Sequence, residues 1–333
     1  MNDKLKIAIL STAHVHAEGW AETLWSVPEA ELITIYDDDP SRGQPVADRF
    51  GVPFTAHLHE ALASVDAVFI AAENSRHPQL TLAAAAAGKH ILCEKPLAIT
   101  AADGVRMITA CRDAGVQLGT AFNCRFLQPV VRAKQLIDAG KIGRVLAIKA
   151  TNHGYLPPGW FTDPEKSGGG AVIDHTVHVA DLMRWFLHAE VTSVYAEVGT
   201  LFHDLPVDDA GLLSLEFDNG VFATLDTSWS RGAGYYVWGD VTMEIIGTAG
   251  TLSLDAFAQH LKLYDHGRLQ PRTENWGGNY DLPLVSSFVQ AIRDGRPVPV
   301  TGLDGLRAAE VAFAAYESAR QHAPVRLVPA TVG

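Results

Sequence analysis

The first 121 residues alternate short apolar runs with segments that have helical patterning and often end at glycine. The apolar runs predict strands at Lys6–Leu10, Glu31–Asp37, Ala67–Ala72, His90–Glu94 and Gln117–Ala121. The segments between them predict helices at Ala17–Ser26, Ser41–Phe50, His77–Ala87 and Ala101–Ala114. Parallel strands need helical crossovers of this kind, so the alternation restricts this region to an α/β fold with a doubly wound parallel sheet.

The regular alternation of predicted strands and helices ends after residue 122. Predicted helices lie at Pro129–Ala139, Ala171–Leu187, Leu284–Asp294 and Gly305–Gln321. Predicted strands lie at Val145–Asn152, Ser193–Gly199, Gly211–Phe217, Val221–Ser228, Val241–Ile246, Thr251–Asp255 and Leu261–Tyr264. Several strands alternate in polarity, which is typical of a mostly antiparallel sheet covered on one face. Because 333 residues exceed what one hydrophobic core usually fills, we predict two domains, 1–122 and 123–333.

Two separate stretches carry side chains suited to proton transfer. Lys95 follows a predicted apolar strand, and ligands of open α/β sheets gather at the carboxyl ends of strands. After three consecutive glycines, the helix predicted at 171–187 carries Asp174, His178 and Asp181 on one face. Taken singly, these residues also fit an exposed loop lysine and a structural histidine. Together, they can move a proton while a cofactor moves a hydride.

Three stretches together resemble the glucose–fructose oxidoreductase/inositol dehydrogenase (Gfo/Idh/MocA) family over nearly the whole chain. The stretch Ala87–Pro96 resembles its Glu-Lys-Pro motif, Gly168–Asp181 its glycine-rich catalytic helix, and Asp304–Ser318 its C-terminal helix. The resemblance implies a Rossmann domain joined to an α+β domain with an open, mostly antiparallel sheet. It also implies an NAD(P)-dependent dehydrogenase that acts on CH–OH groups of a sugar, polyol or related compound.

The resemblance further implies roles for individual side chains. Lys95 would lie beside the nicotinamide and stabilise the developing alkoxide. His178 would be the general acid–base, because an ordinary histidine pKa of about 6.5 lies near working pH, and Asp174 would orient the substrate or Lys95. The predicted substrate contacts are Arg125, His153, Trp160, His175 and Trp276. Aromatic loop residues of this kind suit sugar stacking and domain or subunit contacts equally well.

The loop after the first predicted strand departs from the family. A dinucleotide-binding loop reads Gly-x-Gly-x-x-Gly, which lets the backbone approach the pyrophosphate. Here Ser11, Ala13 and His16 occupy those three positions. We expect either a variant loop that still binds through N–H groups at the helix N-terminus or a reduced affinity for free dinucleotide.

Other residues favour a dinucleotide cofactor. Asp37 ends the second predicted strand, where a carboxylate accepts hydrogen bonds from ribose hydroxyls, although the same acid suits a turn before Pro40. Asp38 follows in place of a basic residue, so nothing evident would hold a 2′-phosphate and NAD is favoured over NADP. The remaining predicted cofactor contacts are His14, Val15, Ala72, Asn74, His77, Glu94, Lys95 and Asn123.

Composition narrows the possible partners. A net charge of −12 argues against nucleic acid, and no window approaches the roughly 18 apolar residues that cross a bilayer. The three cysteines lack disulfide or metal spacing, and the N-terminal apolar run is short, which indicates reduced thiols in a cytoplasmic protein. Asp174 and His178 could suit a metal, but no recognised ligand set surrounds them, so we expect no required metal.

Two alternative functions remain open. The altered loop also fits a lyase, epimerase or glycoside-cleaving enzyme with tightly bound, recycled NAD, and a non-enzymatic sugar-binding protein is the third possibility. The open sheet face would carry apolar side chains in strands such as Val221–Leu225, and a large exposed apolar patch is unusual in a monomer. We therefore expect a homodimer or homotetramer paired through this face, as the resemblance also implies.

Overall fold

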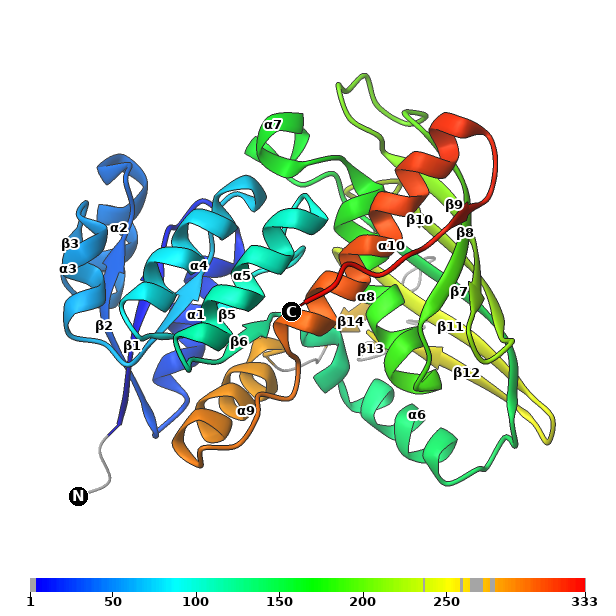
Figure 1. Ribbon diagram of the computed structural model, residues 1–333, viewed down its shortest axis with the longest axis horizontal. Coiled ribbons are helices and arrows are strands. Elements are labelled where there is room, and N and C mark those ends of the chain that lie inside the picture. The colour runs from blue at the N-terminus through cyan, green and yellow to red at the C-terminus, as the bar shows by residue number, and fades with distance from the viewer. Residues whose placement is uncertain (1–3, 236, 258–259, 264–271, 276–278, 333) are drawn as a thin grey trace.

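The structure, a computed structural model, describes residues 4–235, 237–257, 260–263, 272–275 and 279–332, and its two large sheets lie side by side (Figure 1). Helices flank the N-terminal sheet on both faces. The larger C-terminal sheet is covered by helices on the side that faces the N-terminal half. Within the described ranges, no helix has both the length and the apolar character that crossing a bilayer requires.

The N-terminal half contains a six-stranded parallel sheet with the order β3-β2-β1-β4-β5-β6. Its strands are β1 (Leu5–Leu10), β2 (Ala30–Tyr36), β3 (Phe54–Thr55), β4 (Ala67–Ile70), β5 (His90–Cys93) and β6 (Leu118–Thr120). Its helices are α1 (His16–Trp25), α2 (Pro40–Phe50), α3 (Leu58–Ala63), α4 (His77–Ala86) and α5 (Ala101–Asp113). This confirms the predicted doubly wound sheet, whose strand order reverses between β1 and β4, where open sheets bind ligands.

The C-terminal half contains a seven-stranded sheet with the order β12-β11-β7-β10-β9-β8-β15. Its strands are β7 (Val145–Gly154), β8 (Val191–Gly199), β9 (Ala210–Phe217), β10 (Phe222–Ser228), β11 (Gly239–Gly247), β12 (Thr251–Asp255) and β15 (Val325–Arg326). β7 and β10 are parallel and all other neighbours are antiparallel, so the mostly antiparallel sheet is confirmed. A separate pair is formed by β13 (His260–Leu263) and β14 (Arg272–Asn275).

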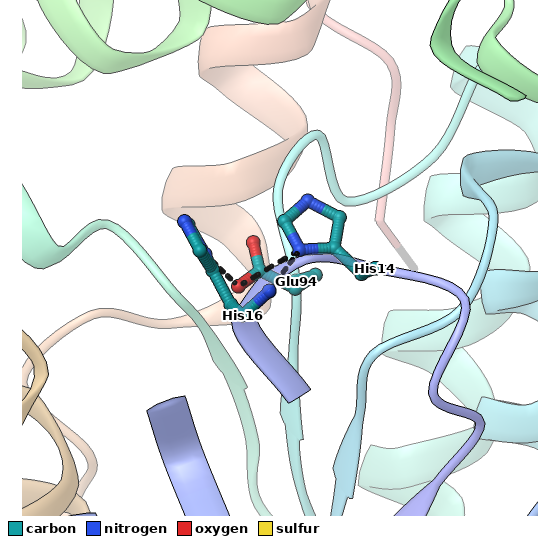
Figure 2. A group of neighbouring side chains, drawn as sticks. All are labelled: His14, His16 and Glu94. Atoms are coloured by element: carbon teal, nitrogen blue, oxygen red, sulfur yellow. Dashed lines mark hydrogen bonds and ion pairs between the residues drawn. The ribbon is translucent and has the colours of Figure 1, made fainter. Parts of the chain in front are cut away.

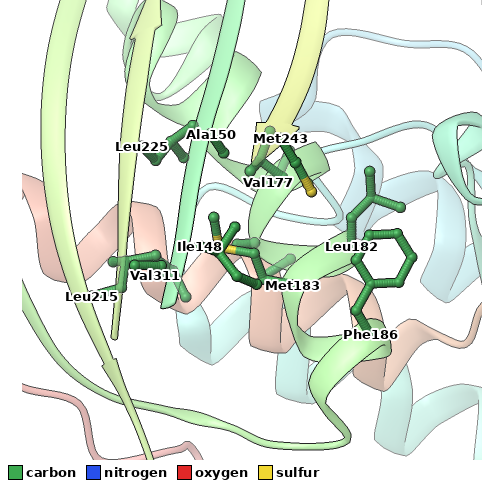
Figure 3. Close-up of a cluster of buried hydrophobic side chains, with 14 of the residues drawn as sticks. Ile148, Ala150, Val177, Leu182, Met183, Phe186, Leu215, Leu225, Met243 and Val311 are labelled. Carbon is green, nitrogen blue, oxygen red and sulfur yellow. The ribbon is translucent and has the colours of Figure 1, made fainter. Parts of the chain in front are cut away.

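Helices α8 (Ala171–Leu187) and α10 (Gly302–Gln321) cover the inner face of the seven-stranded sheet. Figure 3 shows Val177, Met183 and Phe186 of α8 beside apolar side chains of the strands. The other labelled members of this core are Ile148, Ala150, Leu182, Leu215, Leu225, Met243 and Val311. Each large side chain buried in this way contributes roughly 1.5–3 kcal/mol, so α8 is a firmly packed support for the polar residues it carries.

Helix α9 (Asp281–Arg293) lies with the N-terminal half, although it follows the second sheet in the sequence. Its residues Leu284, Val285 and Phe288 share one buried cluster with Ile7 of β1. A division at residue 122 therefore follows the order of the sequence, whereas α9 returns across it in space. The remaining helices are α6 (Gln128–Asp138), α7 (Pro164–Ser167) and the 3₁₀ turns η1 (Asn74–Arg76), η2 (Asn123–Phe126) and η3 (Gly159–Thr162).

The outward positions of the seven-stranded sheet mix charged, polar and a few apolar side chains. Of the apolar residues in the stretch 221–225, Phe222 points outward and is 61% exposed. Val221, Ala223 and Leu225 belong to the core, because side chains along a strand alternate between its two faces. The apolar part of this face is therefore smaller than the sequence suggested, and pairing of subunits through it stays a prediction.

Candidate active site

A cavity of about 670 Å³ lies where the two halves meet, beyond the carboxyl end of β5. One wall is formed by the loop after β1 and the start of α1. The other is formed by α8, residues 155–161 and the start of α9. Lys95, Asp174 and His178 all line it, so the three residues predicted to be catalytic are brought together.

Lys95 and Asp174 form a buried ion pair beside this cavity. The Nζ atom of Lys95 lies 2.5 Å from Oδ1 of Asp174, and Nε1 of Trp229 donates to Oδ2 of Asp174 at 3.1 Å. Burial opposes both charges, but the ion pair outweighs it, so the pKa of Asp174 lies well below its ordinary value and the pKa of Lys95 is raised. Both groups are therefore charged at neutral pH, and Lys95 acts as a hydrogen-bond donor rather than a base.

The start of α8 is fixed by a close approach of two backbone segments. Gly169 has φ of +153°, and a Cβ added at Gly170 would collide with the carbonyl oxygen of Asp208. The Asp208 carboxylate accepts hydrogen bonds from two N–H groups at this helix end, at 2.9 and 2.7 Å, and from the Tyr316 hydroxyl at 2.8 Å. The triple glycine thus allows a capped helix start that holds Asp174, one turn in, at a fixed place.

His178 lies one turn after Asp174 and lines the same cavity. Its Nδ1 atom is 3.8 Å from the sulfur of Cys124. Burial, followed by the nearby charge of Lys95, lowers the pKa of His178 well below its ordinary value. His178 is therefore neutral at neutral pH and can accept a proton from a molecule bound in the cavity.

His175 lines the cavity as well, but both of its ring nitrogens face protein groups. Its Nδ1–H donates to the carbonyl oxygen of Asn152 at 2.9 Å, and Nε2 lies 3.3 Å from Oδ2 of Asp174. Gly154 leaves room for the ring, because a Cβ there would come within 2.8 Å of it. These contacts place His175 between β7 and the Asp174 carboxylate.

The loop after β1 keeps the turn of a dinucleotide-binding loop without its glycines. Ser11, at the first glycine position, has φ of +71°, which non-glycine residues seldom adopt. Its hydroxyl accepts the Ala13 N–H at 3.2 Å and so closes the turn locally. From the other half, Nε1 of Trp160 donates to the Ala13 carbonyl at 2.9 Å. Trp160, predicted to contact substrate, therefore lies against the loop.

Asp37 is fully buried, and its carboxylate is hydrogen-bonded to other residues of the protein. Its carboxylate accepts from the N–H and hydroxyl of Thr12 at 2.7 and 2.9 Å, and from the Arg42 guanidinium at 2.7 and 2.9 Å. Despite burial, these bonds lower the pKa of Asp37 to about 2. Ribose binding by Asp37 stays a prediction that would require some of these bonds to be exchanged. The adjacent Asp38 is the exposed acid at this strand end and pairs with Arg76 at 2.8 Å.

Two histidines of this loop meet the carboxylate that follows β5 (Figure 2). The Nδ1 atoms of His16 and His14 lie 2.7 and 3.9 Å from Oε1 of Glu94. Burial lowers the pKa of His14 to about 3, whereas for His16 the attraction of Glu94 outweighs burial and raises the pKa. The Nε2 atom of His14 is buried, has no partner among the described residues and belongs to a residue of the cavity wall, so a ligand can satisfy it.

The other predicted cofactor residues divide between cavity and framework. Val15 and Asn123 line the cavity. The His77 ring contacts two carbonyls, including that of Ala72 at 3.3 Å, and thereby links the turns after β4 and β5. Asn74 donates to a carbonyl of α7 at 2.8 Å, which ties the two halves together.

Two predicted substrate residues lie away from the cavity. Arg125 forms an ion pair with Asp181 of α8 at 2.5 Å and is not among the lining residues. His153 points to the outer face of β7, because side chains alternate along the strand, and lies 3.1 and 3.3 Å from two aspartates there. Trp276, a third, falls outside the described residues.

Several residues of the site had no distinct signal in the sequence. Trp229 reaches Asp174 from the end of β10, and Asp281 enters the cavity wall at the start of α9. Trp238 also lines the cavity and is 39% exposed. Their places depend on contacts between distant segments, so spacing along the chain could not reveal them.

Comparison with known proteins identifies the family. Residues 6–122 match the model of the oxidoreductase family with an NAD-binding Rossmann fold, and residues 130–253 match the GFO/IDH/MocA C-terminal domain. The chain belongs to the GFO/IDH/MocA oxidoreductase family. This confirms the resemblance drawn from the Glu-Lys-Pro motif and the glycine-rich helix, and the chain is an oxidoreductase with an NAD-binding Rossmann domain.

Members of this family with differing substrates are similar to the chain over most of its length. Myo-inositol 2-dehydrogenase of Thermotoga maritima is 30% identical over 322 residues, which cover 92% of this chain and 94% of the relative. D-xylose 1-dehydrogenase (NADP(+)) 2 of Haloferax volcanii is 30% identical and covers 97% of this chain and 100% of its own. The crystal structure of GenD2 from gentamicin A biosynthesis in complex with NAD superposes with a TM-score of 0.90 at 27% identity, covering 98% and 97% of the two chains.

Proposed function

We propose that this GFO/IDH/MocA protein is an NAD-dependent dehydrogenase that oxidises a secondary alcohol of a sugar, polyol or related compound. The observation that carries the proposal is the meeting of a charged lysine, its carboxylate partner and a neutral histidine, Lys95, Asp174 and His178, in one cavity beside β5. The names of the relatives, an inositol and a xylose dehydrogenase, support this substrate class.

In this proposal each side chain has one task. His178 takes the hydroxyl proton through Nε2, because its Nδ1 faces Cys124. The Lys95 ammonium has three N–H donors, and after one has been given to Asp174 another can be donated to the substrate oxygen as it becomes an alkoxide. The bound dinucleotide supplies the acceptor for the hydride that leaves the same carbon.

The residues around the loop after β1 fit a bound dinucleotide. Ser11 maintains the left-handed turn, and the unpartnered Nε2 of His14 provides a donor for a phosphate or carboxamide oxygen. Residues 11–16, Glu94 and Asn123 would hold the dinucleotide along the carboxyl ends of β1 and β5.

The charges at the end of β2 support NAD over NADP. Asp37, Asp38 and Glu73 contribute three carboxylates, which pair with the two guanidinium groups of Arg42 and Arg76. The arginines are therefore already neutralised, and a 2′-phosphate would meet an excess of one negative charge.

The test is a panel of sugars and polyols offered to the purified protein with NAD or with NADP, while reduced nicotinamide is followed by absorbance. Multiple turnovers with NAD, and weaker activity with NADP, are expected. The altered loop also suits a lyase or epimerase that recycles bound NAD. In that case the freshly purified protein would contain nicotinamide, and substrate would be converted without net reduction of added NAD.

We also propose a homodimer or homotetramer in the cytoplasm, paired through the outer face of the seven-stranded sheet. The exposed Leu212, Phe222 and Ile246, on β9, β10 and β11 of this sheet, support this face as the contact. Light scattering at micromolar concentration should give at least twice the mass of one chain. Phe222→Lys should reduce that mass, and a monomeric mass for the unaltered protein would rule the proposal out.

A further inference from the structure

Three metal-ligating side chains meet at the loop after β1. One ring nitrogen each from His14 and His16 and one carboxylate oxygen of Glu94 lie within 4.8 Å of one another (Figure 2). In the part of the chain that the structure describes, no other three histidine, cysteine or carboxylate side chains gather as a possible metal site. Spacing along the chain could not reveal this group, because Glu94 is 78 residues from His16.

The donor set suits a metal that prefers nitrogen and oxygen ligands. Two imidazoles and one carboxylate bind Zn²⁺ in catalytic sites and leave a fourth coordination position open. His14 and His16 line the cavity, and Glu94 is buried behind them. We propose that His14, His16 and Glu94 bind a divalent transition-metal ion of the zinc class, with the open coordination position facing the cavity.

The charges around the cavity favour a cation at this place. Glu22, Asp174 and Asp281 line it, whereas Lys95 is the one lysine or arginine among the described lining residues. Asp174 already neutralises Lys95. Glu94, in turn, forms ion pairs with His14 and His16 alone among the described residues, so a divalent ion held by the two rings would lie directly against its negative charge.

The three ligand atoms lie within 4.8 Å of one another and would have to adjust to bind one ion. Metal–ligand distances of about 2.0–2.2 Å place the ligand atoms of a tetrahedral site roughly 3.3–3.5 Å apart. The distances from Oε1 of Glu94 to Nδ1 of His16, 2.7 Å, and to Nδ1 of His14, 3.9 Å, lie on either side of that spacing. Nδ1 of His14 accepts a hydrogen bond from the backbone N–H of His16 at 3.2 Å. A metal bound to this nitrogen would use the same lone pair and replace that hydrogen bond. The His16 ring, 36% exposed, has room to shift.

The test is a zinc titration of the full metal-free protein by calorimetry, without nucleotide, together with the visible spectrum of the cobalt-loaded protein. One saturable Zn²⁺ site per chain is expected, and His16→Ala and Glu94→Gln should each weaken it at least about tenfold. His57 and His59 provide a matched control, because they have the same spacing, are exposed and have ring centroids 6.0 Å apart. Their double replacement by alanine should leave zinc affinity unchanged.

Three results would overturn this assignment. The first is the absence of saturable zinc binding to the unaltered protein. The second is zinc binding that persists unchanged in both His16→Ala and Glu94→Gln, and the third is its loss in the His57 and His59 control. Because His16 is partly exposed, His16→Ala should fold, and a thermal melt of each variant checks this. The outcome does not depend on dehydrogenase activity, so it is separable from the proposed function.

Discussion

Helix α8 carries two buried ion pairs about two turns apart, and they differ in their access to the cavity. Asp174 pairs with Lys95 and Asp181 pairs with Arg125, each at 2.5 Å. Asp174 is 8% exposed and lines the cavity, whereas Asp181 has no exposed surface. The same kind of carboxylate on the same helix face thus meets the cavity at one end and is fully enclosed by the fold at the other.

The partner cations explain the difference. Arg125 holds both oxygens of Asp181 with its fork, at 2.5 and 2.6 Å, and also contacts Asp304 of α10 at 3.1 Å. In a bidentate pair of this kind, the guanidinium donates its best-placed N–H groups to the carboxylate within the protein. Lys95 reaches one carboxylate oxygen of Asp174 and, at 3.5 Å, its backbone carbonyl, while Trp229 satisfies the other carboxylate oxygen, so the ammonium keeps one donor for a bound molecule.

The largest expected effect tests the end of α8 that carries Asp174 and His178 and lines the cavity. His178→Ala removes the group proposed to take the proton, and turnover should fall by about 10²–10⁴-fold with the fold retained. His188→Asn, at the exposed C-terminal end of the same helix, is the matched control and should leave turnover nearly unchanged. Steady-state kinetics on both variants decides the point, and near-normal turnover of His178→Ala would remove it from the mechanism.

The next effect tests the buried pair of Arg125 and Asp181 further along α8. Arg125→Ala leaves Asp181 buried without its partner, which should lower the free energy of unfolding by about 3–5 kcal/mol. Arg132→Ala, at an exposed arginine of α6, should change it by less than about 0.5 kcal/mol. Urea unfolding measures both. A small loss for Arg125→Ala would mean that this pair is not needed for the fold.

The contrast between the two pairs also marks how far the sequence could be interpreted. The bounds of α8 were predicted to the residue, because glycines precede it and apolar residues recur along it with helical spacing. That spacing placed Asp174 and Asp181 on one face. It could not tell which of them meets the cavity, because Arg125 and Asp304 come from two distant segments.

Other parts of the fold and site escaped prediction for related reasons. The two residues of β3 and the six of α3 carry too little periodicity to stand out. Asp37 was placed correctly at the end of β2, but its capture by Arg42 of the following helix depends on side-chain geometry. Lys95 was singled out by its place after a strand and Asp174 by its helical spacing, and the family resemblance gave them roles, whereas Trp229 has no motif and was missed.

A smaller effect tests the support of Asp174. Trp229→Phe removes the N–H that satisfies Oδ2 of Asp174 while keeping an aromatic ring, and we expect turnover to fall about tenfold, equivalent to about 1.4 kcal/mol. Trp185→Phe is the matched change at the other pair, because the Trp185 ring lies 5.5 Å from the Arg125 guanidinium. It should alter stability slightly and turnover little; equal losses of turnover would contradict the separation.

The smallest expected effect concerns pH. Burial lowers the pKa of His178, so the histidine stays neutral, and able to accept a proton, below pH 6.5. The midpoint of the acidic limb in the pH profile of kcat/KM should therefore lie below pH 6.5. The same shift means that the stability contributed by neutral His178 is complete above pH 6.5 and is lost as pH drops toward its folded-state pKa. A limb near or above 6.5 that disappears in a His178 variant would contradict this environment.

The central claim is that one ion pair serves the reaction and the other the fold, and Lys95→Met compared with Arg125→Met tests it most directly. Turnover and urea unfolding should be measured on both variants. We predict that Lys95→Met lowers turnover by about 10²–10³-fold and costs less stability, because Asp174 keeps Trp229 and the cavity. Arg125→Met should show the reverse pattern. Parallel losses of turnover and stability in the two variants would contradict the account.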